Sequence, residues 1–322
     1  MMMTPTFRSS LAQSMNDLVA FKRMEGFDYT AQARILGLFD AFLCNQGYCQ
    51  STLNQQIVDT YIAQTANLGK NGRYNRLSTV RVFSRYLHQF DPTSYVMREI
   101  PVKCPTQPRW YLYSPEDIAV LLKYAKILEP AGSLRPHSYY TLVGLLYATG
   151  LRIEEALALN IADLDMNQGL LFVRNGKFGK ERYVPLHSTT IDAINRYILR
   201  RKVTSSSDDE SSLFLNSSGT QRLKYAGVSK TFRQMIRHCK IGRGAQKQPR
   251  LHDLRHTYAC NCVLRWYEEG VDVNSKLPIL ATALGHVDIN KTQVYLHASA
   301  RLFQYAAQRF YGTFTACCGK AV

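Results

Sequence analysis

Proline divides this 322-residue chain into two parts. Four prolines stand within residues 91–112, and each removes a backbone donor and clashes with the preceding helical turn. A helix cannot cross such a stretch, and the length is also more than one ordinary domain needs. We therefore predict two domains, over residues 1–100 and 113–322, joined by a linker over 101–112.

The part before the prolines is predicted to be helical. Apolar residues recur at helical spacing over 26–44, 53–68 and about 74–90. The third of these segments contains no acidic residue, which weakens the ordinary reading of its arginines as a solvated surface and favours contact with an anion. The arginines concerned are Arg73, Arg76, Arg81 and Arg85.

The part after the prolines is predicted to be mainly α with one small antiparallel sheet. Ser114 followed by Pro115 and two acids is a typical helix start, and apolar helices follow through residue 151. Short strand-like runs at 170–174 and 182–186 are separated by a glycine-containing turn, which predicts a β-hairpin. The chain reads as helical again from about residue 228. The fold class is thus mainly α, or α+β.

The charge of the chain points to a polyanionic partner. Lys and Arg number 40 against 24 Asp and Glu, so the net charge is +16, and both parts are basic. Nucleic acid is a better candidate than a membrane surface, because no lipid-anchoring or amphipathic basic segment appears, and no stretch is apolar and long enough to span a bilayer. The N-terminus has no signal-peptide core, so we expect a cytoplasmic protein. Its eight cysteines form no C-x-x-C pair, and we predict neither a disulfide framework nor a metal site.

Four short motifs carry groups that can do chemistry. Ala148 to Glu155 reads ATGLRIEE, the hairpin tip reads NGKFGK, residues 251–257 read LHDLRHT, and Leu284-Gly285-His286 precedes a tyrosine in TQVYLH. Each has an ordinary alternative: an i,i+3 ion pair, a solvated turn lysine, a helix cap, a packed tyrosine. Together they supply two arginines, a lysine, histidines and a tyrosine.

That combination suits phosphoryl transfer without a metal. Guanidinium groups bind planar oxyanions through two parallel hydrogen bonds, and so can neutralise the charge that grows on a phosphodiester. A tyrosine hydroxyl can hold the phosphoryl group covalently, a histidine can take the tyrosine proton, and a lysine can protonate the departing oxygen. We therefore expect no metal and no other cofactor.

In their order, the motifs resemble those of the tyrosine recombinase family, which includes phage integrases and Xer-type recombinases. The resemblance covers residues 113–299, and residues 14–90 fit the family's helical DNA-binding domain by pattern. It implies a C-shaped clamp around double-stranded DNA that carries a recombination site, and strand exchange through a 3′-phosphotyrosyl bond without ATP or metal. Chromosome-dimer resolution and movement of a phage or another mobile element remain open alternatives.

The resemblance also implies a role for each residue of the motifs. Arg152 and Arg255 clamp the scissile phosphate, Lys177 is the general acid, His252 accepts the proton of the nucleophile Tyr295, and His286 hydrogen-bonds the phosphate. Three further motif residues are expected to orient these groups: Glu155, Asp253 and His256. Contacts with the DNA backbone are expected from Lys180, Lys240, Arg243, Lys247 and Arg250.

Two segments depart from the simplest reading. Residues 266–278 look like a surface insertion between the motifs. An apolar stripe over about 302–314 either packs on its own domain or, as the family implies, docks into a neighbouring protomer of a tetramer, with a related recombinase as a further alternative partner. Two other functions also stay open: a type IB topoisomerase, and a DNA-binding accessory protein that does not cut.

Overall fold

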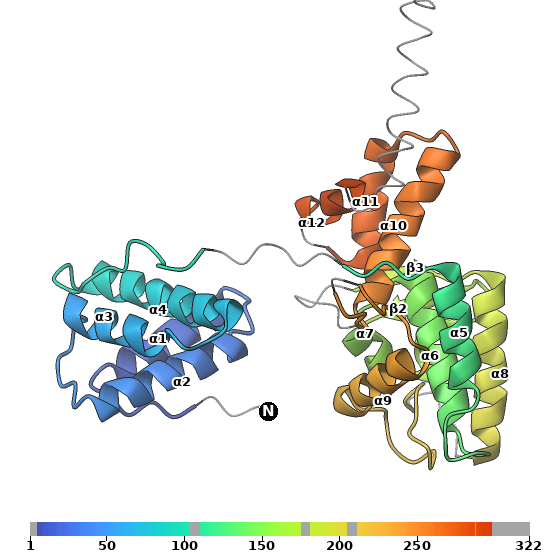
Figure 1. Ribbon diagram of the computed structural model, residues 1–322, viewed down its shortest axis with the longest axis horizontal. Coiled ribbons are helices and arrows are strands. Elements are labelled where there is room, and N and C mark those ends of the chain that lie inside the picture. The colour runs from blue at the N-terminus through green and yellow to red at the C-terminus, as the bar shows by residue number, and fades with distance from the viewer. Residues whose placement is uncertain are drawn as a thin grey trace, which may run out of the picture. The chain divides into compact units, whose positions relative to one another are not determined.

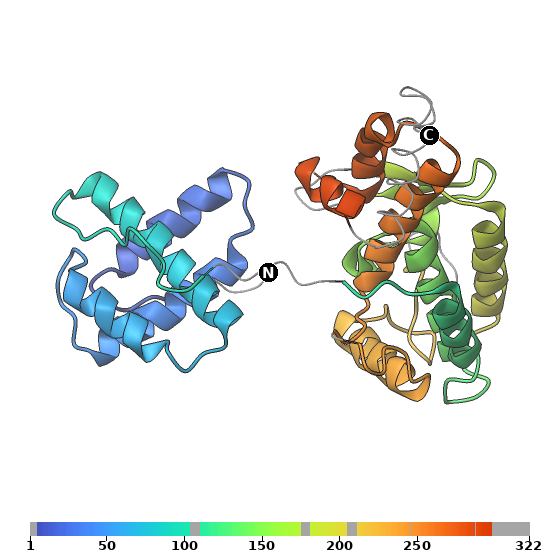
Figure 2. The same cartoon turned by 45° about the horizontal axis from the view of Figure 1, so that its top comes forward.

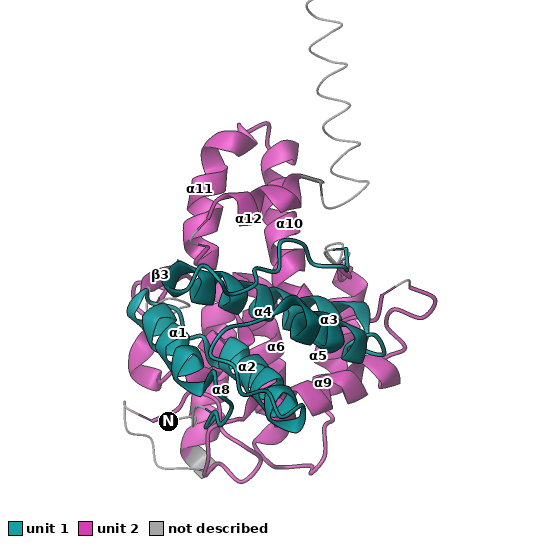
Figure 3. Cartoon of the chain, turned by 90° about the vertical axis from the view of Figure 1, so that its left-hand side faces the viewer, with its two compact units in different colours: residues 1–108 teal, residues 109–322 magenta. Residues whose placement is uncertain are grey.

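The chain folds as two compact units. The computed structural model describes residues 5–103, 110–174, 181–204, 211–245, 247–286 and 288–297. The units are Met1–Pro108 and Arg109–Val322, which Figure 3 draws in teal and magenta. Their division falls inside the proline-containing segment 101–112.

Unit 1 is a small helical domain. Within residues 5–103 its helices are α1 (Ala12–Met24), α2 (Thr30–Asn45), α3 (Gln55–Gln64) and α4 (Lys70–Phe90), seen in blue to teal in Figure 1. They meet around aromatic rings: the ring of Phe39 lies edge-on to Tyr61, with centroids 4.8 Å apart. α4 buries Val80 and Leu87 in this core and keeps Arg85 exposed. The unit therefore has its own apolar core and exposes Arg85 on α4.

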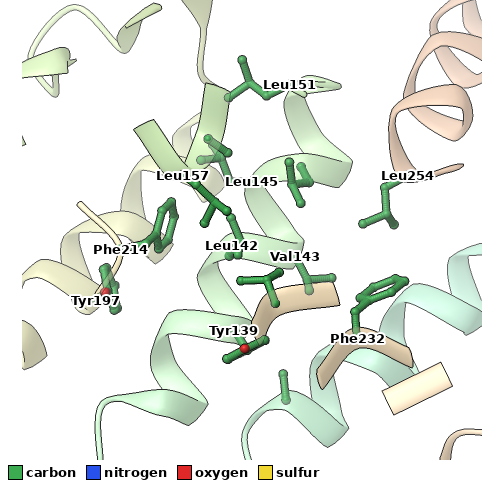
Figure 4. Packing of buried hydrophobic residues seen from close by; sticks show 14 of the residues in the cluster. Tyr139, Leu142, Val143, Leu145, Leu151, Leu157, Tyr197, Phe214, Phe232 and Leu254 are labelled. Atoms are coloured by element: carbon green, nitrogen blue, oxygen red, sulfur yellow. The ribbon is translucent and has the colours of Figure 1, made fainter. Parts of the chain in front are cut away.

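Unit 2 is built around one buried helix, α6 (Arg135–Thr149). The helices α5 (Pro115–Ala125), α8 (Ser188–Thr204) and α10 (Asp253–Glu268) pack against it. Figure 4 shows Leu142, Val143 and Leu145 of α6 inside this cluster of buried side chains. α6 has 15 residues, and among the described helices none has both the length and the hydropathy of a membrane span. Apolar residues all around α6 suit a helix that other helices enclose.

A three-stranded antiparallel sheet lies beside these helices. Its strands are β1 (Leu164–Asp165), β2 (Leu170–Val173) and β3 (Arg182–Pro185), in the order β1-β2-β3. β2 and β3 pair with Val173 opposite Arg182. The predicted mainly helical fold with one small hairpin is confirmed.

The segment 266–278, which was predicted to be a surface insertion, is mostly helical. α10 continues to Glu268, a turn at Gly270 follows, and α11 (Val273–Leu284) begins directly. Val273 and Leu277 are buried beside α10, and α10 and α11 lie side by side in both Figure 1 and Figure 2. The helices were not predicted because Gly270 and Pro278 interrupt the helical spacing of the apolar residues in the sequence.

The remaining elements of unit 2 are short or lie at its edge. They are the helices α7 (Ile153–Ala158), α9 (Tyr225–His238) and α12 (Asn290–Gln293) and the 3-10 turns η1 (Ile161–Asp163) and η3 (Val294–His297). The described motif residues stand in or next to α7, α10, α11 and η3. α6 contacts α7 and α10, and α10 in turn contacts α11 and η3.

Candidate active site

Gly150 ends α6 and turns the chain sharply into α7. Its φ is 63°, a left-handed conformation, and an added Cβ would lie 2.4 Å from Cδ1 of Tyr258. Any other residue here would be strained and would also push Tyr258 away. The turn places Arg152 at the N-cap position of α7. The Gly-Leu-Arg sequence therefore fixes the position of Arg152 at the start of α7.

Backbone carbonyls at two helix ends hold the guanidinium groups of Arg152 and Arg255. Nη1 of Arg255 donates to the carbonyl of Gly150 at 2.7 Å, and its Nη2 donates to Leu284 at 2.5 Å. Nη2 of Arg152 donates to the carbonyl of Gly285 at 3.1 Å. The last carbonyls of a helix carry partial negative charge and lack intrahelical partners, so they suit a cation. Both arginines are thus fixed side by side.

Arg255 is buried, with 2% of its surface exposed. Burial and, second to it, the neighbouring charge of Arg152 lower the pKa of its guanidinium to about 10. The group stays cationic at neutral pH. No carboxylate in the described part of the chain forms an ion pair with it. A buried cation held only by neutral carbonyls is a strong site for an incoming anion.

Glu155 lies behind the two arginines and joins Arg152 to Arg182 of β3. Its carboxylate accepts from Nη1 of Arg152 at 2.7 Å and from Nη2 of Arg182 at 2.7 Å, and it is 6% exposed. Burial alone raises the pKa of Glu155, but the hydrogen bonds from Arg182 and Arg152 outweigh it and lower the pKa. The carboxylate therefore stays ionised and positions Arg152.

Sequence reasoning assigned no role to Arg182. It is 9% exposed, and its Nε donates to the carbonyl of Ala283 at 2.9 Å. A signal was present, because Arg182 shares the inward face of its strand with Val184. An arginine at a buried strand position needs an anionic partner, and that partner is Glu155 of the ATGLRIEE motif.

Tyr295 is the buried tyrosine of this site, at 2% exposure on η3. Burial raises the pKa of its hydroxyl to about 12, while the charge of Arg255 acts in the opposite direction. The hydroxyl oxygen lies 3.0 Å from Nδ1 of His256. A phenol with such a pKa is neutral at pH 7 and needs a proton acceptor before it can attack.

His256, rather than His252, is the histidine in contact with the Tyr295 hydroxyl. Burial and the charges of neighbouring His252 and Arg250 lower the pKa of His256 to about 3, so its ring is neutral at pH 7. His252 stands at the N-cap position of α10 with its side chain exposed, and its ring meets that of His256 edge-on at 4.9 Å. The two histidines form a pair, with His256 next to the tyrosine.

His286 follows the left-handed turn of Gly285 at the end of α11. Its Nδ1 is 2.8 Å from Oγ1 of Thr292, and its ring is nearly parallel to that of Tyr295, with centroids 6.4 Å apart. Burial and the charges of Arg255 and Arg152 lower the pKa of His286 to about 4. The structure thus brings Arg152, Arg255, His286 and Tyr295 together, with the two histidines of α10 beside them.

The other expected residues are placed as follows. Asp253 is fully buried and binds the guanidinium of Arg250, with Oδ1 2.9 Å from Nη2. Lys240 adopts a left-handed φ of 58° in the turn after α9, and Lys247 is half-buried. The four arginines of unit 1 lie along α4. Lys177, Lys180 and the segment 302–314 lie outside the described residues.

The motif region matches a known family. The model of the phage integrase family fits residues 114–301, which is more than half of the chain. The chain belongs to the phage integrase family. As a tyrosine recombinase of this family, it is an enzyme of DNA strand transfer and site-specific recombination.

Relatives of the chain are named as integrases or recombinases. A putative integrase/recombinase, y4rB, from Sinorhizobium fredii is 35% identical over 94% of this chain and 97% of its own length. Tyrosine recombinase XerC from Chlamydia trachomatis is 30% identical over 70% of this chain and 67% of its own. These names favour the recombinase over the topoisomerase and the accessory protein.

Solved structures share the fold. The XerH site-specific recombinase bound to a palindromic difH substrate, after cleavage, aligns with a TM-score of 0.65 at 20% identity and covers 88% of this chain and 80% of that one. The Tn1549 transposon integrase with transposon right end DNA also gives 0.65, at 16% identity, covering 94% and 99%.

Proposed function

We propose that this phage integrase family member cuts each strand of a specific DNA site by attack of Tyr295 on the scissile phosphate. The phosphorus–O5′ bond breaks as the phosphotyrosyl bond forms, and a 5′-hydroxyl of another strand reverses the step. One observation carries this proposal: Tyr295 is buried next to two arginines whose guanidiniums are fixed by helix-end carbonyls. Such fixed cations stabilise charge in a transition state without reorganising.

The remaining groups have complementary roles in the proposal. Arg152 and Arg255 neutralise the phosphate oxygens, and His286 hydrogen-bonds one of them. Lys177 gives a proton to the departing 5′-oxygen. Glu155 keeps Arg152 aimed by the hydrogen bond at 2.7 Å. No metal or nucleotide is needed, because the energy of the broken bond is kept in the phosphotyrosine.

For the tyrosine proton, the hydrogen bond favours His256 over His252 as the first acceptor. The imidazole lies 3.0 Å from the hydroxyl and so is placed to take the proton directly. Geometry and not basicity carries this assignment, because burial makes the DNA-free ring a weak base. His252, whose ring lies edge-on to that of His256, would then either contact the phosphate or accept the proton from His256 in a second step.

Replacing His256 by alanine is therefore expected to slow formation of the covalent adduct by about a hundredfold or more. The reason is that the Tyr295 hydroxyl loses the acceptor with which it is in contact. Single-turnover adduct formation on a nicked DNA substrate measures the rate, and His252→Ala is the matched variant. A rate unchanged in His256→Ala and lost in His252→Ala would return the proton to His252.

The function itself is tested with the DNA that flanks the protein's own gene. The purified chain is incubated with that DNA in EDTA and without ATP, and covalent protein–DNA adducts are mapped at nucleotide resolution. Adducts at one defined position support the proposal. Relaxation of supercoiled DNA that lacks this site would favour a topoisomerase, and binding without any adduct would favour an accessory protein.

DNA binding is proposed to depend on cations of both units. For unit 1 we expect Arg85→Gln to reduce the log–log slope of affinity against salt by about 0.9, the value for one phosphate contact. Arg85 is exposed on α4. Lys22→Gln is the control, because Lys22 is 2.6 Å from Glu25 and already neutralised. Titrations at several salt concentrations measure the slope, and equal slopes for wild type and Arg85→Gln would remove this residue from the interface.

The assembly and the location stay proposals of the same kind. We infer a tetramer on DNA, with the apolar stripe near 302–314 as the link between protomers, from the sequence pattern and the family. A cytoplasmic location follows from the proposed DNA substrate.

A further inference from the structure

Trp110 lies against the proposed proton acceptor. Its indole stacks on the His256 ring with centroids 4.4 Å apart and planes 17° apart, and it lies 5.2 Å from the ring of Tyr295. Trp110 comes from the segment that leads into α5, far in sequence from α10 and η3. It is half-buried and packs against the cluster that contains Tyr295.

The segment that carries Trp110 is hydrogen-bonded to α10 and to the residues just before it, on both sides of His256. The backbone N–H of Tyr113 donates to Oγ1 of Thr257 at 3.1 Å, and its hydroxyl donates to the carbonyl of Arg250 at 3.0 Å. These two bonds fix where the segment crosses the start of α10. The backbone next to Trp110 is therefore held in place, so the stacking of the indole on the imidazole is fixed by the fold.

Stacking of this kind has two physical consequences. It restricts rotation of the His256 ring, and it covers one ring face and so removes water from it. The charged and titratable groups that face His256 are His252, Arg250, Arg255, Lys247 and Tyr295. Apart from the tyrosine they are basic, so they disfavour an imidazolium in the same direction as the loss of water.

We propose that Trp110 is a positioning residue for strand cleavage, which holds the His256 ring with Nδ1 toward the Tyr295 hydroxyl and shields that ring from water. This role rests on the proposed function. Trp110 belongs to none of the motifs that carry the chemistry, and only the packing of three separate segments brings it to the tyrosine.

The test compares Trp110→Ala with Trp110→Phe in single-turnover adduct formation. The alanine variant is expected to lose about tenfold in rate, and the phenylalanine variant to stay within about twofold, since a phenyl ring still stacks. Trp266→Ala is the matched control, because Trp266 packs on the same cluster and, in the described part of the chain, makes no ring contact with His256. Thermal unfolding of all variants shows whether each is folded at the assay temperature.

The pH profile separates positioning from general loss of stability. With Trp110 removed, water reaches the imidazole and the pKa of His256 rises from about 3 toward the ordinary value of histidine. A larger fraction is then protonated near pH 6 and cannot accept the tyrosine proton. The acid limb of adduct formation should therefore move to higher pH in Trp110→Ala and stay in place in Trp110→Phe and Trp266→Ala.

A DNA-free measurement tests the stack independently of cleavage. The chain has two tryptophans, so Trp266→Phe leaves Trp110 as the sole indole. In that background His256→Ala should change the emission of Trp110, because removal of the stacked ring exposes that face of the indole to water, and His286→Ala should not. A changed emission without any adduct in wild type would contradict the proposed function while leaving the stack in place.

Three results would overturn the inference. They are a wild-type rate and acid limb in Trp110→Ala, an equal loss in Trp266→Ala, and Trp110 emission that does not respond to His256→Ala.

Discussion

Replacement of Tyr295 by phenylalanine is expected to abolish the covalent protein–DNA adduct completely. The variant lacks the hydroxyl oxygen that is proposed to form the phosphotyrosyl bond, while both arginines that are proposed to bind the phosphate remain. DNA affinity should stay within about twofold, because the phosphate contacts carry most of the binding. Denaturing gels of reactions on a nicked substrate measure the adduct, and titration in a gel-shift assay measures the affinity.

Tyr258→Phe is the control for this experiment. Tyr258 packs on the same cluster, against the turn of Gly150, and should keep its adduct after loss of the hydroxyl. Loss of the Tyr295 hydroxyl also removes one hydrogen bond to His256, which costs about 1 kcal/mol of stability and leaves the domain folded. An adduct that persists in Tyr295→Phe would assign the nucleophile to another tyrosine.

Much of the fold follows from local sequence signals. The prolines of 91–112 predict the division into two units, and the strand-like runs beside a glycine turn predict the β2–β3 hairpin. The glycine before Leu151 predicts a turn that delivers Arg152. These signals act over a few residues, so the sequence carries them directly.

Contacts between distant segments could not be predicted in the same way. Helical spacing places His252 and His256 on one face of α10, one turn apart, but only the position of η3 decides which of them touches Tyr295. The role of Arg182 depends on strand register against α7, and that of Trp110 on a segment that crosses α10. The helices within residues 266–278 were not predicted for a different reason. A glycine and an internal proline interrupt the helical pattern of the sequence, whereas in the structure Val273 and Leu277 are buried on one face of α11.

Glu155→Leu is expected to lower the free energy of unfolding of unit 2 by about 3–5 kcal/mol, the cost of breaking a buried ion pair from one side. The substitution leaves Arg152 and Arg182 next to each other without their shared carboxylate. Urea unfolding followed by tryptophan fluorescence reports on unit 2 alone, because both tryptophans lie in it. Glu154→Leu is the control on an exposed neighbour and should change stability by less than about 0.5 kcal/mol.

The pH dependence of this difference tests its electrostatic origin. Hydrogen bonds from Arg182 and Arg152 lower the pKa of Glu155 in the folded protein against the burial that raises it, so the folded state binds this proton less readily than the unfolded state. The carboxylate therefore stabilises unit 2 fully above the ordinary pKa of glutamate, and this contribution is lost as the pH falls through the lowered folded-state pKa. The gap between wild type and Glu155→Leu should accordingly shrink on acidification. A gap that stays constant with pH would mean that leucine acts through packing alone, and that Glu155 does not hold Arg152 in place by its charge.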